Sequence, residues 1–594
     1  MNQIESIQKS ALFSDRNFLI LIGMLLLFVT AIGARRKPAG RGTGRYASAT
    51  EILTHLGNWA RLPLSAVAVA LIYTGLLSMV LAWRYWEEGT LMDRGRLGMI
   101  ACLVLILAIL IYWILLEAVL SKFETNRFLL GGKWFFAIPL SLREKDRFEH
   151  IRVQGRAGTG KTDGFMFPQL IEDASGSCSA VVLDVKSPEA FHALAGAWCA
   201  KGKKVILFDP YHPDCPGFNP LSSGTGRALD QIEETVYGKQ NNNAENASRW
   251  FVIQERRLFR WMCELILTYQ DPCQRSLPMV YELANRGVPA LEAAVTYCGR
   301  KDIQEKMMPL FQHKQRLQDV LSGILNTLDL FADPKLSAAF SRADLDLDLL
   351  FREPTLLILA SPFSNPKARL ATAILLRAIM LKVYERPVRT AKDGPPLFFY
   401  LDEFYALHFP DLADFANTAR SARAGVVTFL QAEEQLYRYE RHEIASIATN
   451  TKTQIYLQGC DMPTCKRLSE QMGKRLIEEK RTGRSWGRRA TITTAYVERP
   501  LMEPSEIYHL EPDKPLVFIG GMRPFQIKRV SSYRTRRFKR RRGLPAAAYR
   551  PSLEPLTPPA YRDLDLPPGG APPSPTMPTA PGPMGDDVIG WELT

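Results

Sequence analysis

The chain has 594 residues, of which 46% are hydrophobic and 23% charged, so it can bury a large core and is not a disordered protein. At about 150 residues per domain, it is expected to hold more than one domain. Its net charge of +14 favours a polyanion or an anionic membrane surface as a partner. Nine cysteines without a C-x-x-C pair exclude a disulfide-stapled secreted scaffold and argue against a structural zinc site.

Three apolar runs, at 18–34, 62–83 and 97–120, predict membrane spans. As helices they would be about 25, 33 and 36 Å long, against a hydrocarbon core about 30 Å thick. The second and third are long enough to span; the first either spans or lies in the interface, and buried core helices are the alternative for all three. The loop between the first two runs is strongly basic, which makes it cytoplasmic by the positive-inside rule. The long C-terminal portion is then cytoplasmic too, which argues against a cleaved signal peptide.

Residues 155–162, Gly-Arg-Ala-Gly-Thr-Gly-Lys-Thr, match the complete P-loop pattern G-x-x-x-x-G-K-[ST]. In this pattern backbone N–H groups surround the phosphates of ATP, the lysine reaches the β- and γ-oxygens, and the final hydroxyl ligates Mg²⁺. A short strand at 151–153 precedes the loop, which makes a coincidental glycine turn the weaker alternative. The predicted nucleotide-binding residues are Gly155, Gly158, Thr159, Gly160, Lys161 and Thr162.

An apolar run at 397–401 ends in Asp402 and Glu403. A buried parallel strand delivers the carboxylates at its C-terminal end to the ligand edge of the sheet. Asp402 is therefore predicted to support Mg²⁺ together with Thr162, and Glu403 to polarise the attacking water. Gln431 directly follows another strand, where its amide could sense the γ-phosphate; an ordinary polar strand end is the alternative.

Strand-length apolar segments recur with helix-length spacers between them. This alternation predicts an α/β fold with a mostly parallel sheet covered by helices. The predicted strands are 151–153, 181–185, 205–208, 356–359, 397–401, 426–430, 454–457 and 516–519.

Over roughly residues 10 to 535 the chain resembles the coupling proteins of bacterial type IV secretion and conjugation systems, the VirD4/TraG/TrwB-like ATPases. The resemblance implies a homo-hexameric, RecA-like motor of the bacterial inner membrane, with its ATPase domain in the cytoplasm, that links DNA and its relaxase to the secretion channel. One departure concerns Lys186: the family often reads Asp-Pro-Lys-Gly where this chain has Asp-Val-Lys-Ser. The features that carry the resemblance are the apolar runs, the P-loop, Asp184-Val-Lys186, Phe218-Asn-Pro-Leu221, Asp402-Glu403, Gln431 and Arg499-Pro-Leu501.

The resemblance also implies a cation that acts on the neighbouring subunit of a ring. Arg420, eleven residues before Gln431, falls where the family's proposed arginine finger lies, although Ala419 replaces the usual glycine. Arg423 is a rival, and either side chain could simply be solvated.

The family's domain order, together with the basic and Pro-rich composition of the C-terminal region, divides the chain into five parts. The all-α insertion would include a helix over 250–267, and a simple helical excursion without a DNA role is the alternative for it. The expected parts are a membrane region at 1–125, a RecA-like domain at 126–221 and 346–533, an inserted all-α domain at 222–345, a basic run at 534–543 and a disordered Pro-rich tail at 544–594 with a candidate docking peptide.

The basic run predicts contacts with nucleic-acid phosphates that do not depend on base sequence. Tyr533 and Phe538 could stack on unpaired bases. A solvated charge run or a contact with anionic lipid are the alternatives. The predicted DNA-binding residues are Arg536, Arg537, Lys539, Arg540, Arg541 and Arg542.

Together these features favour an inner-membrane ATPase that moves DNA with its relaxase toward a type IV channel. One alternative is a nucleotide-gated receptor whose cargo is mainly protein. Another is a membrane-tethered DNA pump of the FtsK/HerA kind, against which the helical insertion and the Asp184-Val-Lys186 strand argue moderately.

Overall fold

The computed structural model describes residues 126–132, 139–212, 215–222, 226–237, 246–269, 271, 274–386, 394–404, 412–438, 441–483 and 491–546. The predicted membrane runs and the tail beyond residue 546 lie outside this part of the chain. Among the helices it contains, none combines the length and the apolar character needed to cross a bilayer.

One large sheet organises the α/β unit. Its nine strands lie in the order β13-β12-β9-β3-β8-β7-β4-β6-β5. All neighbours from β9 to β5 pair in parallel, and β12 and β13 pair antiparallel at one edge, so the predicted mostly parallel sheet is confirmed. The strands are β3 (Ile151–Gln154), β4 (Ser179–Asp184), β5 (Lys204–Phe208), β6 (Thr355–Ala360), β7 (Leu397–Asp402), β8 (Ala424–Leu430), β9 (Thr453–Tyr456), β12 (Leu516–Ile519) and β13 (Phe525–Gln526).

The central strands are apolar because both of their faces are covered. Every residue of β4, β6, β7 and β8 is buried, as expected of a parallel sheet between helical layers. Alternate side chains of β7 lie on opposite faces of the sheet. Phe398 stacks on Phe148 at a centroid distance of 5.7 Å, and Phe399 meets Phe415 of α17 (Leu412–Thr418) edge-on at 5.2 Å. The strand thereby joins two core layers.

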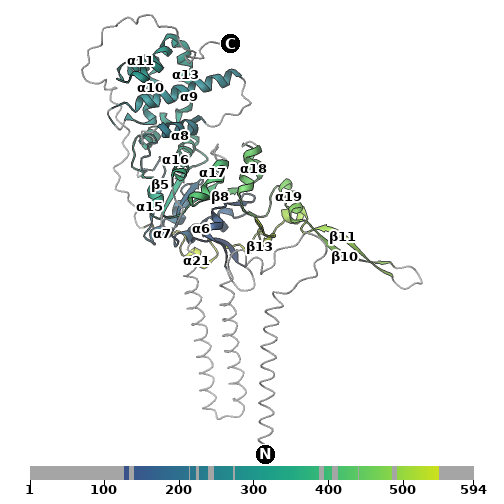
Figure 1. Cartoon of the computed structure of the whole chain (residues 1–594). Helices are drawn as coiled ribbons and strands as arrows, with labels where there is room; N and C mark the ends of the chain where they lie inside the picture. The colour runs from purple at the N-terminus through teal and green to yellow at the C-terminus, as the bar shows by residue number, and fades with distance from the viewer. Residues whose placement is uncertain are drawn as a thin grey trace, which may run out of the picture. The chain divides into compact units, whose positions relative to one another are not determined.

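Helices of the α/β unit follow or connect the strands (Figure 1). Helices α6 and α7 contribute Leu170 and Trp198 to the same core as Phe398. The helices are α5 (Glu144–Arg147), η2 (Thr162–Met166), α6 (Phe167–Asp173), α7 (Glu189–Cys199), α15 (Leu349–Arg352), α16 (Pro366–Glu385), α17 (Leu412–Thr418), η8 (Ala419–Ala422), η9 (Glu433–Arg438), α18 (Arg441–Asn450), α19 (Met462–Met472), α20 (Pro504–Tyr508) and α21 (Arg536–Lys539).

A second compact unit includes residues 217–233 and 240–343, and its described residues form helices and the loops between them, without a strand. Helix α9 is 21 residues long, corresponds to the helix predicted at 250–267, and buries Leu258 and Met262. The helices that begin or lie in this unit are α8 (Gly226–Tyr237), α9 (Asn246–Ile266), α10 (Leu277–Asn285), α11 (Gly287–Tyr297), α12 (Lys301–Met307), η4 (Met308–His313), α13 (Lys314–Thr327), η5 (Asp329–Ala332) and α14 (Pro334–Ser341).

Two antiparallel hairpins were not predicted from the sequence. Strands β1 (Phe128–Gly132) and β2 (Pro139–Leu142) form a small sheet that buries Phe128 and Leu142. Strands β10 (Lys474–Gly483) and β11 (Thr491–Pro500) pair along ten residues each and extend away from α19 as a ribbon (Figure 1).

A buried polar network ties α6 to β7. Arg147 makes two hydrogen bonds to the Asp173 carboxylate, at 2.9 and 2.8 Å, and its guanidinium lies 3.4 Å from the centre of the Phe398 ring. The Tyr400 hydroxyl accepts from Arg147 at 2.8 Å and donates to Asp173 at 2.6 Å. Removing one member of such a buried charge network leaves the others with an unsatisfied hydrogen-bonding group, which is destabilising.

We predict that Tyr400→Phe lowers the free energy of unfolding by about 1–3 kcal/mol, because it deprives Arg147 and Asp173 of a buried partner. Thermal melting of the purified protein measures the change. Tyr496→Phe is the matched control, since the Tyr496 side chain is 70% exposed and should tolerate loss of its hydroxyl. Equal melting temperatures for the two variants would contradict the role assigned to the network.

Candidate nucleotide-binding site

The P-loop lies at the carboxyl end of β3, between the ends of β8 and β9. Gly155 donates its N–H to Leu430 O at 3.1 Å, and Leu457 donates to Gln154 O at 2.8 Å. A side chain at position 155 would place its Cβ 2.7 Å from that of Leu457. Gly158 and Gly160 have φ of +78° and +84°, which glycine adopts without strain. The end of the neighbouring strand therefore requires glycine at 155, and the backbone conformation favours glycine at 158 and 160.

Lys161 is buried against the loop that carries it. Its Nζ donates to Gly155 O at 2.7 Å and to Arg156 O at 3.3 Å. Burial lowers the pKa of Lys161, and the nearby Asp402 and Glu403 carboxylates partly oppose that effect. The ammonium group thus lies inside the loop, where a phosphate would compete with the carbonyls for it.

Thr162 and Asp402 meet across the sheet edge, although 240 residues separate them in the chain. The Thr162 hydroxyl donates to Asp402 Oδ2 at 3.3 Å. Asp402 is only 7% exposed, and burial, followed by the adjacent Glu403 charge, raises its pKa to about 6. Such a desolvated carboxylate gains from a bound cation.

Glu403 and Gln431 form a second contact at the same edge. Gln431 Nε2 donates to Glu403 Oε1 at 2.7 Å, and its own backbone N–H donates to Gln435 Oε1 at 2.9 Å. Glu403 has a left-handed backbone with φ of +47°, an uncommon conformation for a non-glycine residue. Because β8 lies between β3 and β7, Gln431 stands between the P-loop and the acidic pair.

The residues at this edge fit a magnesium ion bound with a triphosphate. Mg²⁺ prefers oxygen ligands and usually takes only one or two from protein carboxylates, with phosphates and water supplying the rest. The hydroxyl of Thr162 and the carboxylate of Asp402 provide that set. Within the described residues no group of three or more His, Cys, Asp and Glu side chains could hold a metal without such a partner.

Asp184 and Lys186 follow β4, which pairs with β7. The Asp184 carboxylate accepts N–H bonds from Lys186 at 3.1 Å and Ala190 at 2.9 Å, so it orders the loop that leads into α7. The exposed Lys186 side chain lies near enough to act on the charges of Lys161 and Asp402.

Arg420 and Arg423 lie at the opposite, amino-terminal edge of the sheet, just before β8. Arg420 pairs with Glu149 at 3.0 Å, and its side chain is 67% exposed. Arg423 is 12% exposed, pairs with Glu144 at 2.8 Å and donates to Gly394 O at 3.1 Å. Arg423 is therefore committed to contacts within the fold, and Arg420 is accessible.

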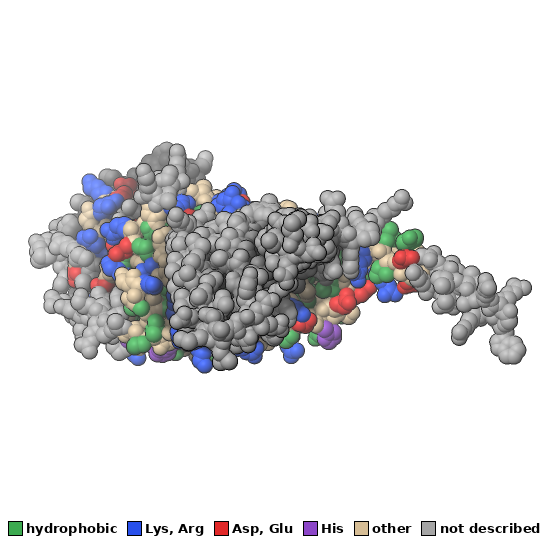
Figure 2. Space-filling view, turned by 90° about the horizontal axis from the view of Figure 1, so that it is seen from below, with side chains coloured by type: hydrophobic (Ala, Val, Ile, Leu, Met, Phe, Trp, Pro, Cys, Tyr) green, Lys and Arg blue, Asp and Glu red, His purple; other side chains and the backbone are tan. Residues whose placement is uncertain are grey.

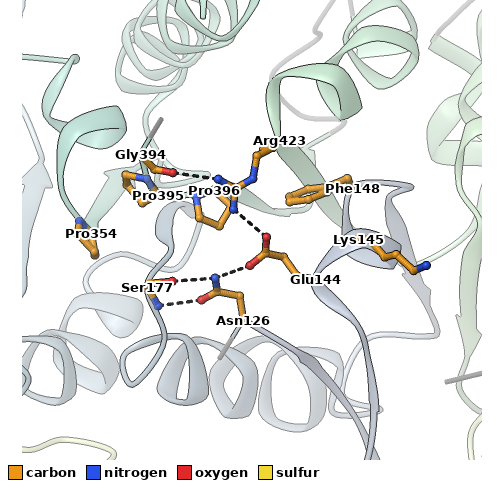
Figure 3. A pocket seen from close by; sticks show the side chains of 10 residues that line it. All are labelled: Asn126, Glu144, Lys145, Phe148, Ser177, Pro354, Gly394, Pro395, Pro396 and Arg423. Atoms are coloured by element: carbon orange, nitrogen blue, oxygen red, sulfur yellow. Dashed lines mark hydrogen bonds and ion pairs between the residues drawn. The ribbon is translucent and has the colours of Figure 1, made fainter. Parts of the chain in front are cut away.

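A cavity of about 530 Å³ opens beside Arg423 (Figure 3). Asn126 bridges its wall, donating to Glu144 at 2.5 Å and to the Ser177 hydroxyl at 3.0 Å. The cavity contains none of the predicted nucleotide-binding residues. Its lining is Asn126, Glu144, Lys145, Phe148, Ser177, Pro354, Gly394, Pro395, Pro396 and Arg423.

The basic run is partly helical and packs on the α/β unit. Phe538 is 2% exposed within the main core, so the expectation that it stacks on bases is wrong: its ring anchors α21. Arg537 pairs with Glu172 at 2.6 Å, and Arg542 pairs with Glu189 at 3.4 Å. Lys and Arg side chains are otherwise scattered among acidic ones over the described surface that Figure 2 displays.

Sequence reasoning missed the contacts that the C-terminal segment makes with the P-loop. Arg529 donates to two carbonyls of that loop, and Ser532 binds Asp163, which follows it. These partners are about 370 residues apart, so no local pattern indicates them.

The P-loop follows β3, the Asp-Glu pair lies at the end of β7, and β8 lies between these two strands. This arrangement is that of a P-loop nucleotide-binding protein. Within that class, the chain belongs to the type IV secretory system conjugative DNA transfer family, whose family model matches residues 122–552.

The relatives of this chain include VirD4 proteins. Protein VirD4 of Agrobacterium fabrum is 25% identical over 429 residues, which cover 69% of this chain and 62% of that protein. Protein VirD4 of Rhizobium rhizogenes is 25% identical over 410 residues, covering 66% and 59%. The chain thus spans about three fifths of the length of these curated relatives.

Solved structures of the conjugative coupling protein TrwB are also similar. The unbound form of TrwBdeltaN70 has a TM-score of 0.49 and 16% identity, covering 66% of this chain and 86% of that one. TrwB in complex with ADP and Mg²⁺ has a TM-score of 0.48 and 16% identity, covering 66% and 87%.

Proposed function

We propose that this protein is a coupling ATPase that uses ATP hydrolysis to deliver DNA with its attached relaxase to a type IV secretion channel. The observation that carries the proposal is the contact of Thr162 with Asp402 at 3.3 Å beside Lys161, in a chain of the conjugative DNA transfer family. A single Mg²⁺–ATP can engage all three side chains. We take the α/β unit to be RecA-like on the same grounds.

Nucleotide binding is assigned to the P-loop. Backbone N–H groups of the loop would hold the phosphate oxygens, and Lys161 would exchange its bonds to Gly155 O and Arg156 O for bonds to the β- and γ-phosphates. Thr162 and Asp402 would hold Mg²⁺, which neutralises phosphate charge when bound.

Hydrolysis is assigned to Glu403, with Gln431 as its partner. Glu403 would take a proton from a water molecule as the water oxygen attacks the γ-phosphorus and the bond to the bridging β–γ oxygen breaks. Gln431 holds Glu403 at 2.7 Å in this structure. A bound γ-phosphate offers the Gln431 amide a second charged acceptor, and we infer that the amide turns to it, which frees Glu403 for catalysis.

We predict that Glu403→Gln lowers kcat for ATP hydrolysis by about 10²-fold or more while ATP still binds, because the variant lacks the proton acceptor. Lys161→Ala should lose binding as well as hydrolysis. Steady-state ATPase assays and nucleotide titration measure both effects, with Glu434→Gln, an exposed neighbouring acid, as the control. Unchanged turnover of Glu403→Gln with an intact fold would sink the assignment.

Arg420 is proposed to act on the ATP of a neighbouring subunit in a ring. It precedes β8, whose seven residues span about 23 Å at 3.3 Å per residue, whereas the nucleotide site lies beyond the far end of β8. The Arg420 side chain therefore cannot reach the nucleotide site of its own subunit, but its exposure leaves it available to a neighbouring subunit. The contacts of Arg423 within the fold disfavour it as the rival.

Mixing two inactive variants tests the action of Arg420 across subunits. Arg420→Ala keeps its nucleotide site, and Lys161→Ala keeps its arginine, so mixed rings contain interfaces with both. We expect each variant alone to lose about 10³-fold in ATPase rate and the mixture to be well above either. A mixture that is only the average of its two components would place Arg420 outside catalysis.

Polyanion binding is proposed for the exposed face of α21 and the residue that follows it. Arg536, Lys539 and Arg540 are exposed and have no acidic partner at ion-pair distance within the described part of the chain. The other three arginines are less available to a polyanion, because Arg537 and Arg542 are paired with acidic residues and Arg541 is half-buried. The family's description, which names DNA transfer, favours DNA over protein as the cargo.

Replacing Arg536, Lys539 and Arg540 together with glutamine should weaken DNA binding and reduce its salt dependence, because each phosphate contact contributes about 0.9 to the slope of log K against log salt. Fluorescence anisotropy with duplex and single-stranded DNA at several salt concentrations measures this. The control variant changes the exposed residues Lys466, Lys474 and Lys514 to glutamine, which removes the same amount of charge elsewhere on the surface. Equal slopes for both triple variants would contradict the assignment.

The membrane location and the assembly belong to the same proposal. The runs at 18–34, 62–83 and 97–120 would anchor the protein in the bacterial inner membrane by two or three spans, with the ATPase unit in the cytoplasm. A homo-hexameric ring would supply the interfaces that Arg420 requires.

A further inference from the structure

Arg529 lies directly over the P-loop. Its Nη1 donates to Thr159 O at 2.7 Å and to Gly160 O at 2.9 Å. Its Nη2 donates to Asp513 Oδ1 at 3.2 Å, and its backbone N–H donates to Asp513 O at 2.8 Å. The side chain is 10% exposed, so the guanidinium is a fixed part of the site.

The glycines of this region leave room for that side chain. A Cβ at Gly160 would lie 1.8 Å from Arg529 Nη1, and one at Gly164 would lie 2.4 Å from Arg529 Cδ. Glycine at 160 therefore serves two purposes, since its φ of +84° also disfavours any other residue.

The segment that carries Arg529 is also anchored at Asp163, the residue that directly follows the P-loop. Ser532 donates to Asp163 Oδ1 through both its N–H, at 2.9 Å, and its hydroxyl, at 2.5 Å. Further along, Arg542 donates to the Ser532 hydroxyl at 2.8 Å, and Phe538 is buried in the core. Arg529 is thus held by its own bond to Asp513 and by the bond of Ser532 to Asp163.

The two carbonyls that Arg529 binds determine the direction of two N–H groups. In a trans peptide the C=O and the following N–H point in opposite directions within one plane. With Thr159 O and Gly160 O turned toward Arg529, the N–H groups of Gly160 and Lys161 must point away from it. These are N–H groups with which a P-loop surrounds phosphates.

We propose that Arg529 is a positioning residue for the nucleotide: it holds the N–H groups of Gly160 and Lys161 in the orientation that receives the phosphates common to ATP and ADP. The proposal rests on the nucleotide binding proposed above. It requires no contact between Arg529 and the nucleotide, because the guanidinium is already engaged with the loop carbonyls and Asp513.

The test compares Arg529→Gln and Arg529→Lys in the full-length protein, with Mg²⁺–ATP and Mg²⁺–ADP as probes in calorimetric titration and ATPase assays. Arg529→Gln should weaken both nucleotides about tenfold and to a similar extent, raising KM more than it lowers kcat. Arg529→Lys, which can still donate to one carbonyl, should recover part of the affinity. Arg286→Gln is the matched control, since its partner Glu282 is on α10.

Lys161→Ala separates failure of this inference from failure of the proposed function. If Lys161→Ala loses nucleotide binding while Arg529→Gln binds as the parent does, only the positioning role is overturned. If Lys161→Ala also binds normally, nucleotide binding at this site is wrong. A loss confined to ATP, with a collapse of kcat, would also overturn the positioning role. Should Arg529→Gln melt early, Asp513→Asn decides, with a smaller equal loss for both nucleotides expected.

Discussion

The relation between the P-loop and the acidic strand depends on a buried ion pair, Arg147 with Asp173, that belongs to neither motif. Asp173 ends α6, the helix that continues from the P-loop, and Tyr400 lies two residues before Asp402 on β7. Arg147 holds both, so α6 and β7 cannot shift independently. Burial of such a pair adds little net stability, but breaking it is costly, and it fixes one arrangement. That arrangement keeps Thr162 within 3.3 Å of Asp402.

The C-terminal segment at 529–542 also contacts the P-loop region and the adjacent core. Arg529 binds the carbonyls of the P-loop, Ser532 binds Asp163, and α21 packs through Phe538 onto the core. The exposed cations proposed to bind DNA are therefore carried by the segment that also holds the phosphate-binding loop. A polyanion bound to α21 would therefore lie only a few residues along the chain from Arg529 and Ser532, which contact the P-loop and Asp163.

Local patterns in the sequence predicted what local physics determines. The P-loop, the Asp402-Glu403 pair and the parallel strands each follow from a few adjacent residues, and the strand ends explain why Thr162 and Asp402 meet. Contacts set by long-range packing were missed: Arg529 lies 369 residues from Gly160, and Phe538 is buried although its neighbours are basic. The β10–β11 ribbon was missed because its strands carry many charged and polar residues, which weaken the apolar alternation.

The central claim is that one Mg²⁺–nucleotide is held between the P-loop and the end of β7. A cryo-electron microscopy structure of the protein with Mg²⁺ and a non-hydrolysable ATP analogue tests it most directly. The account predicts nucleotide density along residues 155–162, Lys161 Nζ moved from Gly155 O to the phosphates, and an ion between Thr162 and Asp402. Nucleotide bound elsewhere, or at the P-loop with Asp402 remote from its ion, would contradict it.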